Sequence, residues 1–384
     1  MLQSDSRILT THTGSLPRPD ELAELHGRRS RGEAIDAEEL NQAIALATAR
    51  VVAAQVAVGI DIGNDGEQAR ESFVTYVQHR MTGFGGTGQR PEKRDLLDHP
   101  DFQALTRKRR AQVSLMAAPA AISDVAYRDT EEVESECALV TDAPFAETFM
   151  TAASPGIVAS VMENRHYHSM EAYLAAVADA LSVEYRCIVE RGLLLQIDAP
   201  DLALERHQLF GDRPLSEFLA WAELAVSALN RALAGIDPGR VRLHVCWGNW
   251  EGPHKYDVAM EVILPALYQA NVGALGLEFA NPRRQHETAA LKKHKLPSHM
   301  VMIAGVIDSK SNFIEHPEVV AQRIEAVVAA VGDRERVMAG VDCGFGTFVG
   351  WEWVTEDVVW DKLKTLRAGA DIASARLWGK QRAA

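Results

Sequence analysis

The sequence predicts an α/β fold, a single (β/α)8 TIM barrel with an N-terminal helical extension and an insertion around residues 90–144. Short apolar runs alternate with long helical patterns along the chain, which is the rhythm of parallel strands joined by helices. Several runs show little polar alternation, as expected for parallel strands covered on both faces. About eight such runs without a repeat or composition break favour a closed barrel over an open sheet. We therefore expect one domain over residues 1–384.

Eight short apolar runs are the predicted strands of this barrel. In chain order they are Ile8–Thr13, Gly59–Gly63, either Gln112–Met116 or Glu147–Ala152, Leu193–Ile197, Val241–Cys246, Ala274–Phe279, Met300–Val306 and Val337–Val341. The stretch Arg90–Pro144 fits the alternation of strands and helices poorly. It is therefore expected to be an insertion or a hairpin over the barrel mouth.

Periodicity and capping residues predict the helices between these strands. Asp36–Val58 begins with an aspartate cap and carries two glutamates in its first turn. Pro317–Val331 has proline in its first turn, where the missing N–H has no helical partner to lose. Ser169–Arg191 and Leu215–Leu233 show similar periodicity. Asp20–Gly27 also precedes the second strand and adds to the N-terminal helical extension.

Composition and charge exclude several classes of protein. A chain of 384 residues with 47% hydrophobic content can bury a large core. Its formal net charge of -13 predicts no nucleic acid and no anionic membrane as a partner, because either would favour a basic face. No apolar run reaches the roughly 20 residues of a membrane helix, and the N-terminus lacks the pattern of a signal peptide. A cytoplasmic location is the expectation.

Four cysteines are too few and too scattered for a disulfide scaffold in a chain of this size. Cys187 lies in a helical pattern and Cys137 in an acidic stretch without a partner motif, so both are expected to be small core residues. Cys246 and Cys343 differ, because each follows a strand-like run and precedes a glycine turn. In a reducing compartment, metal binding or catalysis is the better use of such a pair.

The residues around this pair predict a zinc site. His244 and Cys246 lie two apart on a predicted strand, so both side chains would point into one space. Cys343 would join them from a second strand end, and thiolates with imidazole are preferred zinc ligands. Glu278 is the candidate fourth ligand, because a carboxylate at the end of a buried strand is costly unless it is paired or ligated. An ion pair with one of the arginines that follow it is the alternative.

Other polar residues also follow predicted strands, where a barrel places its chemistry. Gly14 and Ser15 follow the first strand and form either a simple tight turn or a set of backbone N–H groups for a carboxylate. Glu67 follows the second strand. Asp198 ends the fourth, either as a capping or ion-paired residue or as a carboxylate that binds a cationic group of a substrate.

Taken in order, these motifs resemble the catalytic barrel of cobalamin-independent methionine synthase. The resemblance extends from Thr11 to Gly344, and it rests on Thr13–Arg18, Gly66-Glu67, Gln196–Asp198, His244-x-Cys246, Glu278 and Asp342–Gly344. The chain is about half as long as the two-barrel enzyme and resembles only its C-terminal barrel. Shorter single-barrel relatives include the archaeal methionine synthases and the epoxyalkane:coenzyme M transferases.

The resemblance implies an activity and a set of site residues. The family transfers an alkyl group from a small donor to a small thiol that is activated on zinc. The implied zinc ligands are His244, Cys246, Glu278 and Cys343, and the implied homocysteine-binding residues are Gly14, Ser15, Glu67 and Asp198. The family also implies that Glu278 is displaced, or the ligand shell expanded, when the thiol binds.

Two departures from the family pattern concern the donor. Methionine synthases have a histidine, a candidate proton donor, in the segment that reads Asp308-Ser309-Lys310-Ser311 here. Asp308 and Lys310 are therefore the catalytic candidates, and Lys310 would donate a proton if burial or zinc lowered its pKa. An exposed lysine is the alternative. The tryptophan-bearing segment that helps to seat folate is replaced by Phe149–Gly156. Trp247–His254 is either a wall of a donor pocket or a packed loop.

The leading hypothesis is a zinc-dependent thiol S-alkyltransferase with homocysteine as acceptor and a methyl donor of the 5-methyltetrahydrofolate type. The alternative is an epoxyalkane:coenzyme M transferase-like enzyme, or another thiol alkyltransferase with a corrinoid or other non-folate donor. A sulfonate thiol would need cations near the zinc, such as Arg18 or Lys310. The zinc-free uroporphyrinogen decarboxylase barrel and a non-catalytic zinc-stabilised barrel are two further classes. The sequence leaves open whether the chain forms a homo-oligomer.

Overall fold

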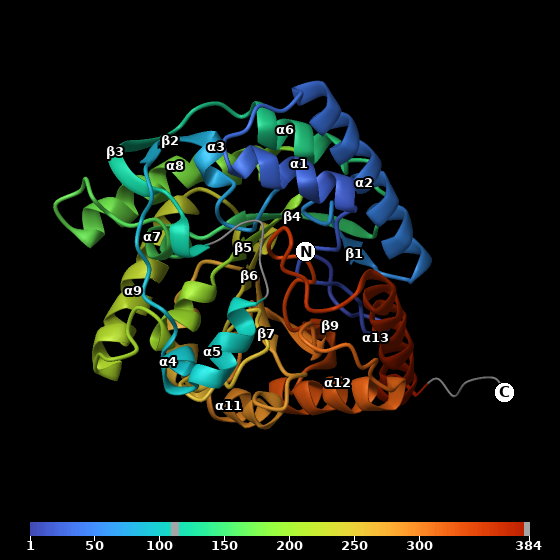
Figure 1. Cartoon of the computed structure of the whole chain (residues 1–384). Helices are drawn as coiled ribbons and strands as arrows, with labels where there is room; N and C mark the ends of the chain where they lie inside the picture. Colours follow the sequence, from blue (N-terminus) through green and yellow to red (C-terminus); the bar gives the residue numbers. More distant parts are fainter. Residues whose placement is uncertain (109–114, 380–384) are drawn as a thin grey trace.

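Seven parallel strands form one curved sheet, in the order β1-β4-β5-β6-β7-β8-β9 (Figure 1). The structure is a computed structural model that describes residues 1–108 and 115–379. The strands of the sheet are β1 (Ile62–Gly63), β4 (Glu147–Ala153), β5 (Leu194–Asp198), β6 (Val241–His244), β7 (Ala274–Glu278), β8 (Val301–Ile307) and β9 (Val337–Val341). All neighbours in the sheet pair in parallel, which confirms the predicted α/β class.

A segment near the N-terminus closes the sheet into a barrel. Thr10 forms a parallel bridge with Ala339 of β9, and Thr11 forms one with Ile62 of β1. The Thr11 N–H donates to the carbonyl of Ala339 at 2.9 Å, and the Ile62 N–H donates to the carbonyl of Thr10 at 3.0 Å. The predicted first strand Ile8–Thr13 thus fills the eighth position, although it pairs through isolated bridges and not through a continuous ladder. The prediction of a (β/α)8 barrel is confirmed.

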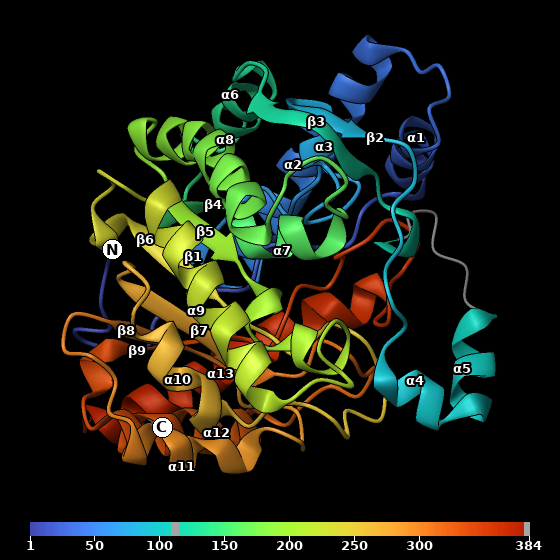
Figure 2. The same ribbon diagram turned by 90° about the vertical axis from the view of Figure 1, so that its left-hand side faces the viewer.

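Helices surround the barrel (Figures 1 and 2). They are α1 (Asp20–Ser30), α2 (Ala37–Ala57), α3 (Val77–Arg80), α4 (Arg94–Asp98), α5 (Pro100–Arg107), α6 (Glu131–Ala138), α7 (Pro155–Val161), α8 (Met170–Glu190), α9 (Leu215–Ala232), α10 (Met260–Leu267), α11 (Thr288–Lys293), α12 (Pro317–Val331) and α13 (Glu356–Leu377). The predicted aspartate cap of α2 is confirmed, and α8 has a serine cap that was not predicted. Asp36 accepts the N–H of Glu38 at the start of α2, and Ser169 accepts the N–H of Ala172 at the start of α8.

The predicted insertion begins earlier than expected. It opens with an antiparallel hairpin of β2 (Met81–Gly85) and β3 (Ala120–Tyr127), between which lie α4 and α5. The alternative third strand, Gln112–Met116, lies mainly outside the described residues, and its last two residues belong to a 3-10 turn. The third barrel strand in chain order is therefore β4, the other of the two alternatives.

The barrel interior changes from apolar to polar along its axis. Near the N-terminal ends of the strands lies an apolar cluster of Leu9, Ile62, Phe149, Leu194, Ala274, Val301, Ile303 and Met338. The buried Arg242 lies over the ring of Phe149, 4.0 Å from its centroid, and donates to the hydroxyl of Thr11 and the carbonyl of His12. Strand β5 shows the same change, because its alternate residues are Leu194, Gln196 and Asp198. Charged side chains therefore gather at the C-terminal ends of the strands.

Helix α2 differs from the expectation about apolar runs. By length and composition alone it could cross a membrane, with a mean hydropathy of 1.2 in its most apolar window and 33% of that window buried. Its buried residues include Leu40, Ile44, Ala47 and Val51, which recur every three or four positions and so lie on one face. This face packs in the fold, as is typical of a helix on the outside of a barrel.

Candidate metal centre and substrate cavity

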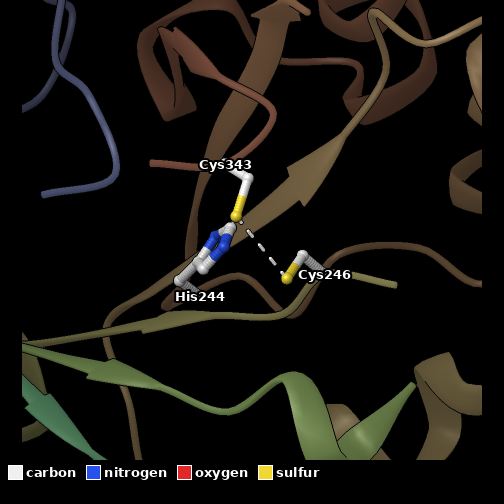
Figure 3. Close-up of side chains that lie close together, drawn as sticks. All are labelled: His244, Cys246 and Cys343. Carbon is white, nitrogen blue, oxygen red and sulfur yellow. Dashed lines mark hydrogen bonds between the residues drawn. The ribbon is translucent and has the colours of Figure 1, made fainter. Parts of the chain in front are cut away.

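His244, Cys246 and Cys343 meet at the C-terminal end of the barrel (Figure 3). His244 is the last residue of β6, and Cys246 lies two residues beyond it rather than on the strand as predicted. Cys343 lies two residues after β9. One potential ligand atom from each residue lies within 4.8 Å of the other two, and all three side chains are buried. The three residues that sequence reasoning selected therefore form a candidate metal centre.

The chemistry of these groups fits a tetrahedral metal ion. The two Sγ atoms are 3.8 Å apart. Two zinc–sulfur bonds of about 2.3 Å at a tetrahedral angle would span about 3.8 Å between the sulfur atoms. The Nε2 atom of His244 is buried without a hydrogen-bond partner among the described residues. The hydrogen bond from Cys343 to Cys246 holds the pKa of Cys246 well below the usual range and raises that of Cys343, so Cys246 is the sulfur that is favoured as a thiolate.

Glu278 and Lys310 form a buried ion pair beside this centre. Glu278 is the last residue of β7, and its Oε1 accepts from Nζ of Lys310 at 3.3 Å. Glu278 is not one of the residues whose ligand atoms gather within 4.8 Å. Burial alone would lower the pKa of Lys310, but the charges of Glu278, Asp342 and Asp308 raise it well above the usual range. The alternative of an exposed lysine is wrong, since Lys310 is 3% exposed, whereas proton donation by Lys310 stays a prediction.

Replacing Lys310 with methionine should lower the free energy of unfolding by about 3 kcal/mol, because it leaves the carboxylate of Glu278 buried without its cation. Urea unfolding of the metal-free protein measures this loss. The double variant K310M/E278Q should recover part of it, since the glutamine carries no charge. Equal stability of K310M and the wild type would show that the ion pair does not hold Glu278 in place.

Asp308 and Asp342 bind backbone rather than the cavity. Asp308 accepts from the N–H of Lys310 and from the hydroxyl of Ser311, which holds the turn after β8. Asp342 accepts the three successive N–H groups from Phe279 to Asn281, with distances between 2.8 and 3.0 Å. The loop that follows Glu278 is thus held by the residue next to Cys343. In the sequence, Asp342 stands out only as part of the motif Asp342–Gly344, and its position at a strand end is the feature that indicates a role in the site.

The Gly14-Ser15 turn packs directly against the other predicted substrate-binding residues. Gly14 has a φ of +138°, and a Cβ there would lie 2.7 Å from Oε1 of Glu67. Only glycine allows this approach. The hydroxyl of Ser15 accepts from the N–H of Gly346 at 3.4 Å. Glu67 itself has a φ of +55°, which is uncommon for a residue with a side chain and typical of strained functional positions.

Glu67 and Asp198 are two buried carboxylates that form no ion pair with any residue that the structure describes. Burial, together with the charge of Asp198, raises the pKa of Glu67 to about 8. Burial also raises the pKa of Asp198 to about 6, although a hydrogen bond from Gln196 at 2.8 Å opposes the shift. Oε2 of Glu67 has no hydrogen-bond partner among the described residues. A cationic ligand would relieve the cost of burying these groups.

One cavity of about 440 Å³ joins these groups. Its wall includes Ser15, Glu67, Asp198, His244, Cys246 and Cys343. Glu278, Asp308 and Lys310 are not among the described residues that line it. Gly248, Asn249 and Trp250 do line it, whereas Trp247 is fully buried. Part of the segment Trp247–His254 thus forms cavity wall, as one of the two predictions had it.

The fold is a closed α/β barrel, and its strand ends carry a candidate metal centre of cysteine and histidine. These two features together indicate the class of metal-dependent barrel enzymes. The family comparison makes the assignment specific. The chain matches the model described as cobalamin-independent synthase, catalytic domain, over residues 8–95 and 102–362. It belongs to this methionine synthase family of methyltransferases, which act on small molecules.

Individual relatives support this membership. The chain is 23% identical over 372 residues to the methionine synthase of Saccharolobus solfataricus. This match covers 96% of this chain and 95% of that protein. It is 25% identical over 370 residues to the methionine synthase of Thermococcus kodakarensis, covering 96% and 94%. It is 28% identical over 246 residues to the 2-hydroxypropyl-CoM lyase of Xanthobacter autotrophicus, but the match covers only 57% of this chain and 59% of the lyase.

A solved structure shows the same fold. The B12-independent methionine synthase from Shewanella sp. W3-18-1, in complex with selenomethionine, superposes with a TM-score of 0.73 at 21% sequence identity. The match covers 97% of this chain and 99% of that one. The barrel with its insertion is therefore a shared fold. The predicted family resemblance is confirmed by the family model.

Proposed function

We propose that the protein is a zinc-dependent S-methyltransferase that alkylates homocysteine. The single observation that carries this proposal is the shared cavity, which places two buried carboxylates beside the cysteine pair and His244. A thiol amino acid has the two groups that this combination would bind, a sulfur for the metal and an ammonium for the carboxylates. Membership of the methionine synthase family supports the same activity.

In this proposal His244, Cys246 and Cys343 hold the zinc ion, and Glu278 is the fourth ligand that gives way to the substrate. Zinc, when bound, would favour the thiolate form of the acceptor at neutral pH, where a free thiol is mostly protonated. Lys310 would receive Glu278 when the carboxylate is displaced, because the two already form an ion pair. The rest of the site would hold the thiolate in line with the carbon to be transferred.

The acceptor is proposed to be an amino acid rather than a sulfonate. Glu67 and Asp198 would bind the ammonium group, and the turn at Gly14 and Ser15 would lie against the carboxylate. A sulfonate thiol would need cations near the zinc, but Arg18 donates to the carbonyls of Gly346 and Glu67 and does not line the cavity. Lys310 is engaged with Glu278. The carboxylates would repel a sulfonate.

Calorimetry on protein of measured zinc content tests this proposal. We expect one zinc per chain, and tighter binding of homocysteine than of 2-mercaptoethanesulfonate. Binding of the sulfonate alone would favour the epoxyalkane-type alternative, and it would make the similarity to the 2-hydroxypropyl-CoM lyase the better guide. Purified protein without zinc, and unable to bind it, would refute the metal centre and favour a decarboxylase-type barrel.

We further infer a single-domain protein that works in the cytoplasm without nucleic acid or membrane. The net charge of -13 and four free cysteines support this inference. Size-exclusion chromatography with light scattering would determine whether the chain forms a homo-oligomer.

A further inference from the structure

The cavity has a second wall whose chemistry differs from that of the metal centre. This outer wall is formed by the insertion and by the loop after β6, and it includes Lys93, Leu96, Met116 and Trp250. In Figures 1 and 2, α4 and α5 lie on the side of the barrel where the strands end. A donor that delivers a carbon to a sulfur on the inner wall would present its leaving atom toward the outer wall. Groups there are therefore positioned to act on the leaving atom.

Among the described residues of this wall, Lys93 is the cation that forms no ion pair with a carboxylate. Within residues 1–108 and 115–379, three cations line the cavity, and the other two are paired. Arg90 pairs with Glu205, and Arg107 pairs with Glu92 at 3.1 Å. Nζ of Lys93 lies 4.1 Å from the ring centroid of Trp250, and among the described residues it forms no ion pair or hydrogen bond.

The surroundings of Lys93 contain both signs of charge. Arg90 faces it from the same segment, and its positive charge disfavours a second cation. Three carboxylates, Glu205, Asp257 and Asp95, favour the cation, but each has another partner. Glu205 pairs with Arg90, Asp257 with Arg284 and His254, and Asp95 with His207.

Lys93 is half-buried in the cavity wall, and loss of solvation there is the largest influence on its amine. It lowers the pKa of Lys93 to about 7, further than the three carboxylates raise it. The pKa of His207, which packs against the same Trp250 ring, is also lowered by burial. A lysine of this kind exchanges a proton near neutral pH, whereas Lys310 stays charged.

We propose that Lys93 is the general acid for the leaving atom of the donor. This inference rests on the proposed thiol alkylation and adds the residue that serves its donor side. The acceptor thiolate forms a bond to the transferred carbon, and the bond from that carbon to nitrogen or oxygen breaks. The electron pair of the broken bond goes to the leaving atom, which takes a proton from the ammonium group of Lys93. The neutral amine then regains a proton from solvent.

The proposal assigns a chemical class to the donor. Its leaving atom is a basic nitrogen or an epoxide oxygen, either of which must gain a proton to leave easily. Glu67 and Asp198 do not compete for this task, because they would face the ammonium group of the acceptor.

Two kinds of probe separate proton donation from other roles. 5-Methyltetrahydrofolate and epoxypropane leave through nitrogen or oxygen, whereas methyl iodide leaves as iodide and needs no proton. Single-turnover rates with zinc-loaded protein and homocysteine are compared for Lys93→Met and Lys93→Arg. Arginine keeps the charge and the contact with Trp250 but does not release its proton. Lys255→Met, at an exposed neighbouring lysine, is the matched control.

We expect both Lys93 variants to slow the reaction of at least one protic donor by about 100-fold or more, and to leave the methyl iodide reaction within a few-fold of wild type. The wild-type rate with that protic donor should fall as the pH rises through about 7, relative to the rate with methyl iodide. The Arg variant should lack this fall.

Several results would overturn the proposal. One is an equal loss with all donors, which would indicate packing, and another is full activity of the Arg variant, which would indicate charge alone. Catalysis with methyl iodide but with neither protic donor would also refute it. Failure of the wild type to alkylate homocysteine with any donor would refute the proposed function as well.

A readout without substrate keeps the two conclusions separate. Acetylation of Lys93 by acetic anhydride, followed by mass spectrometry as a function of pH, reports the pKa of its amine directly. A midpoint near 7 is expected, with Lys255 as the internal reference. A midpoint above about 9, close to that of an ordinary lysine, would overturn the proposal whatever the activity.

Discussion

Replacing Cys343 with serine should abolish zinc binding and alkyl transfer while the barrel stays folded. A serine hydroxyl does not ionise near neutral pH, so it cannot take the place of the thiolate. Changes to residues that only support a metal ligand cost 10–100-fold in metal affinity, and loss of a ligand itself should therefore cost more than about 100-fold. Metal analysis and single-turnover alkylation measure the two losses.

The fold should survive because Cys343 lies in a loop beyond β9, and the barrel core does not depend on its sulfur atom. Thermal unfolding followed by circular dichroism checks this. Cys187→Ser is the matched control, since Cys187 is a buried cysteine on α8 outside the cavity, and this variant should keep both zinc and activity. A C343S variant that retained zinc and full alkylation would refute the metal centre. One that unfolded with the loss of zinc would indicate a structural metal.

Asp198→Asn should raise the KM for homocysteine by about 10- to 100-fold, and Glu67→Gln should do the same. A hydrogen bond to a charged group contributes about 1.5–3 kcal/mol, and each 1.4 kcal/mol is a factor of ten in affinity. Both substitutions keep the size of the side chain and remove only its charge. Steady-state kinetics at fixed donor concentration measure the change.

A matched ligand sharpens this second prediction. 4-Mercaptobutanoate lacks only the amino group of homocysteine, so the wild type should bind it more weakly, and the Asn and Gln variants should lose little further affinity for it. For each variant, calorimetry on the wild type and the variant with both ligands gives the coupling between that carboxylate and the ammonium group directly. Equal losses for both ligands would show that the carboxylates only shape the cavity.

Much of the barrel could be predicted because its signals are local. The strand Val337–Val341 and the helix Pro317–Val331 have the predicted limits. The strand is marked by its own apolar run, and the helix by the proline in its first turn. Ile8–Thr13 was placed correctly in the barrel, but its pairing through isolated bridges depends on two strands distant in the sequence. The insertion lacks regular periodicity, so a hairpin was expected there but neither its start nor the limits of its two strands could be predicted.

The site likewise has features that local sequence predicts and features that depend on distant segments. The convergence of His244, Cys246 and Cys343 follows from their positions at strand ends. The charge of Lys310 does not, because it is set by Glu278 and Asp342 from two other segments of the chain as well as by Asp308 in its own turn. Lys93 could not be found from the sequence, since nothing in the insertion indicated that it would lie against Trp250 within the cavity.

The closure of the barrel at Thr10 and Thr11 also bears on how activity depends on folding. The turn at Ser15 follows this seam directly, and it packs against the loop that carries Cys343. The acceptor site is therefore complete only after the first and last strands have met, at sequence positions more than 300 residues apart. A chain that had folded every βα unit but had not joined its two ends would lack one side of that site. Enzyme activity during refolding would then report the last step of assembly, and it would lag behind the recovery of helical structure.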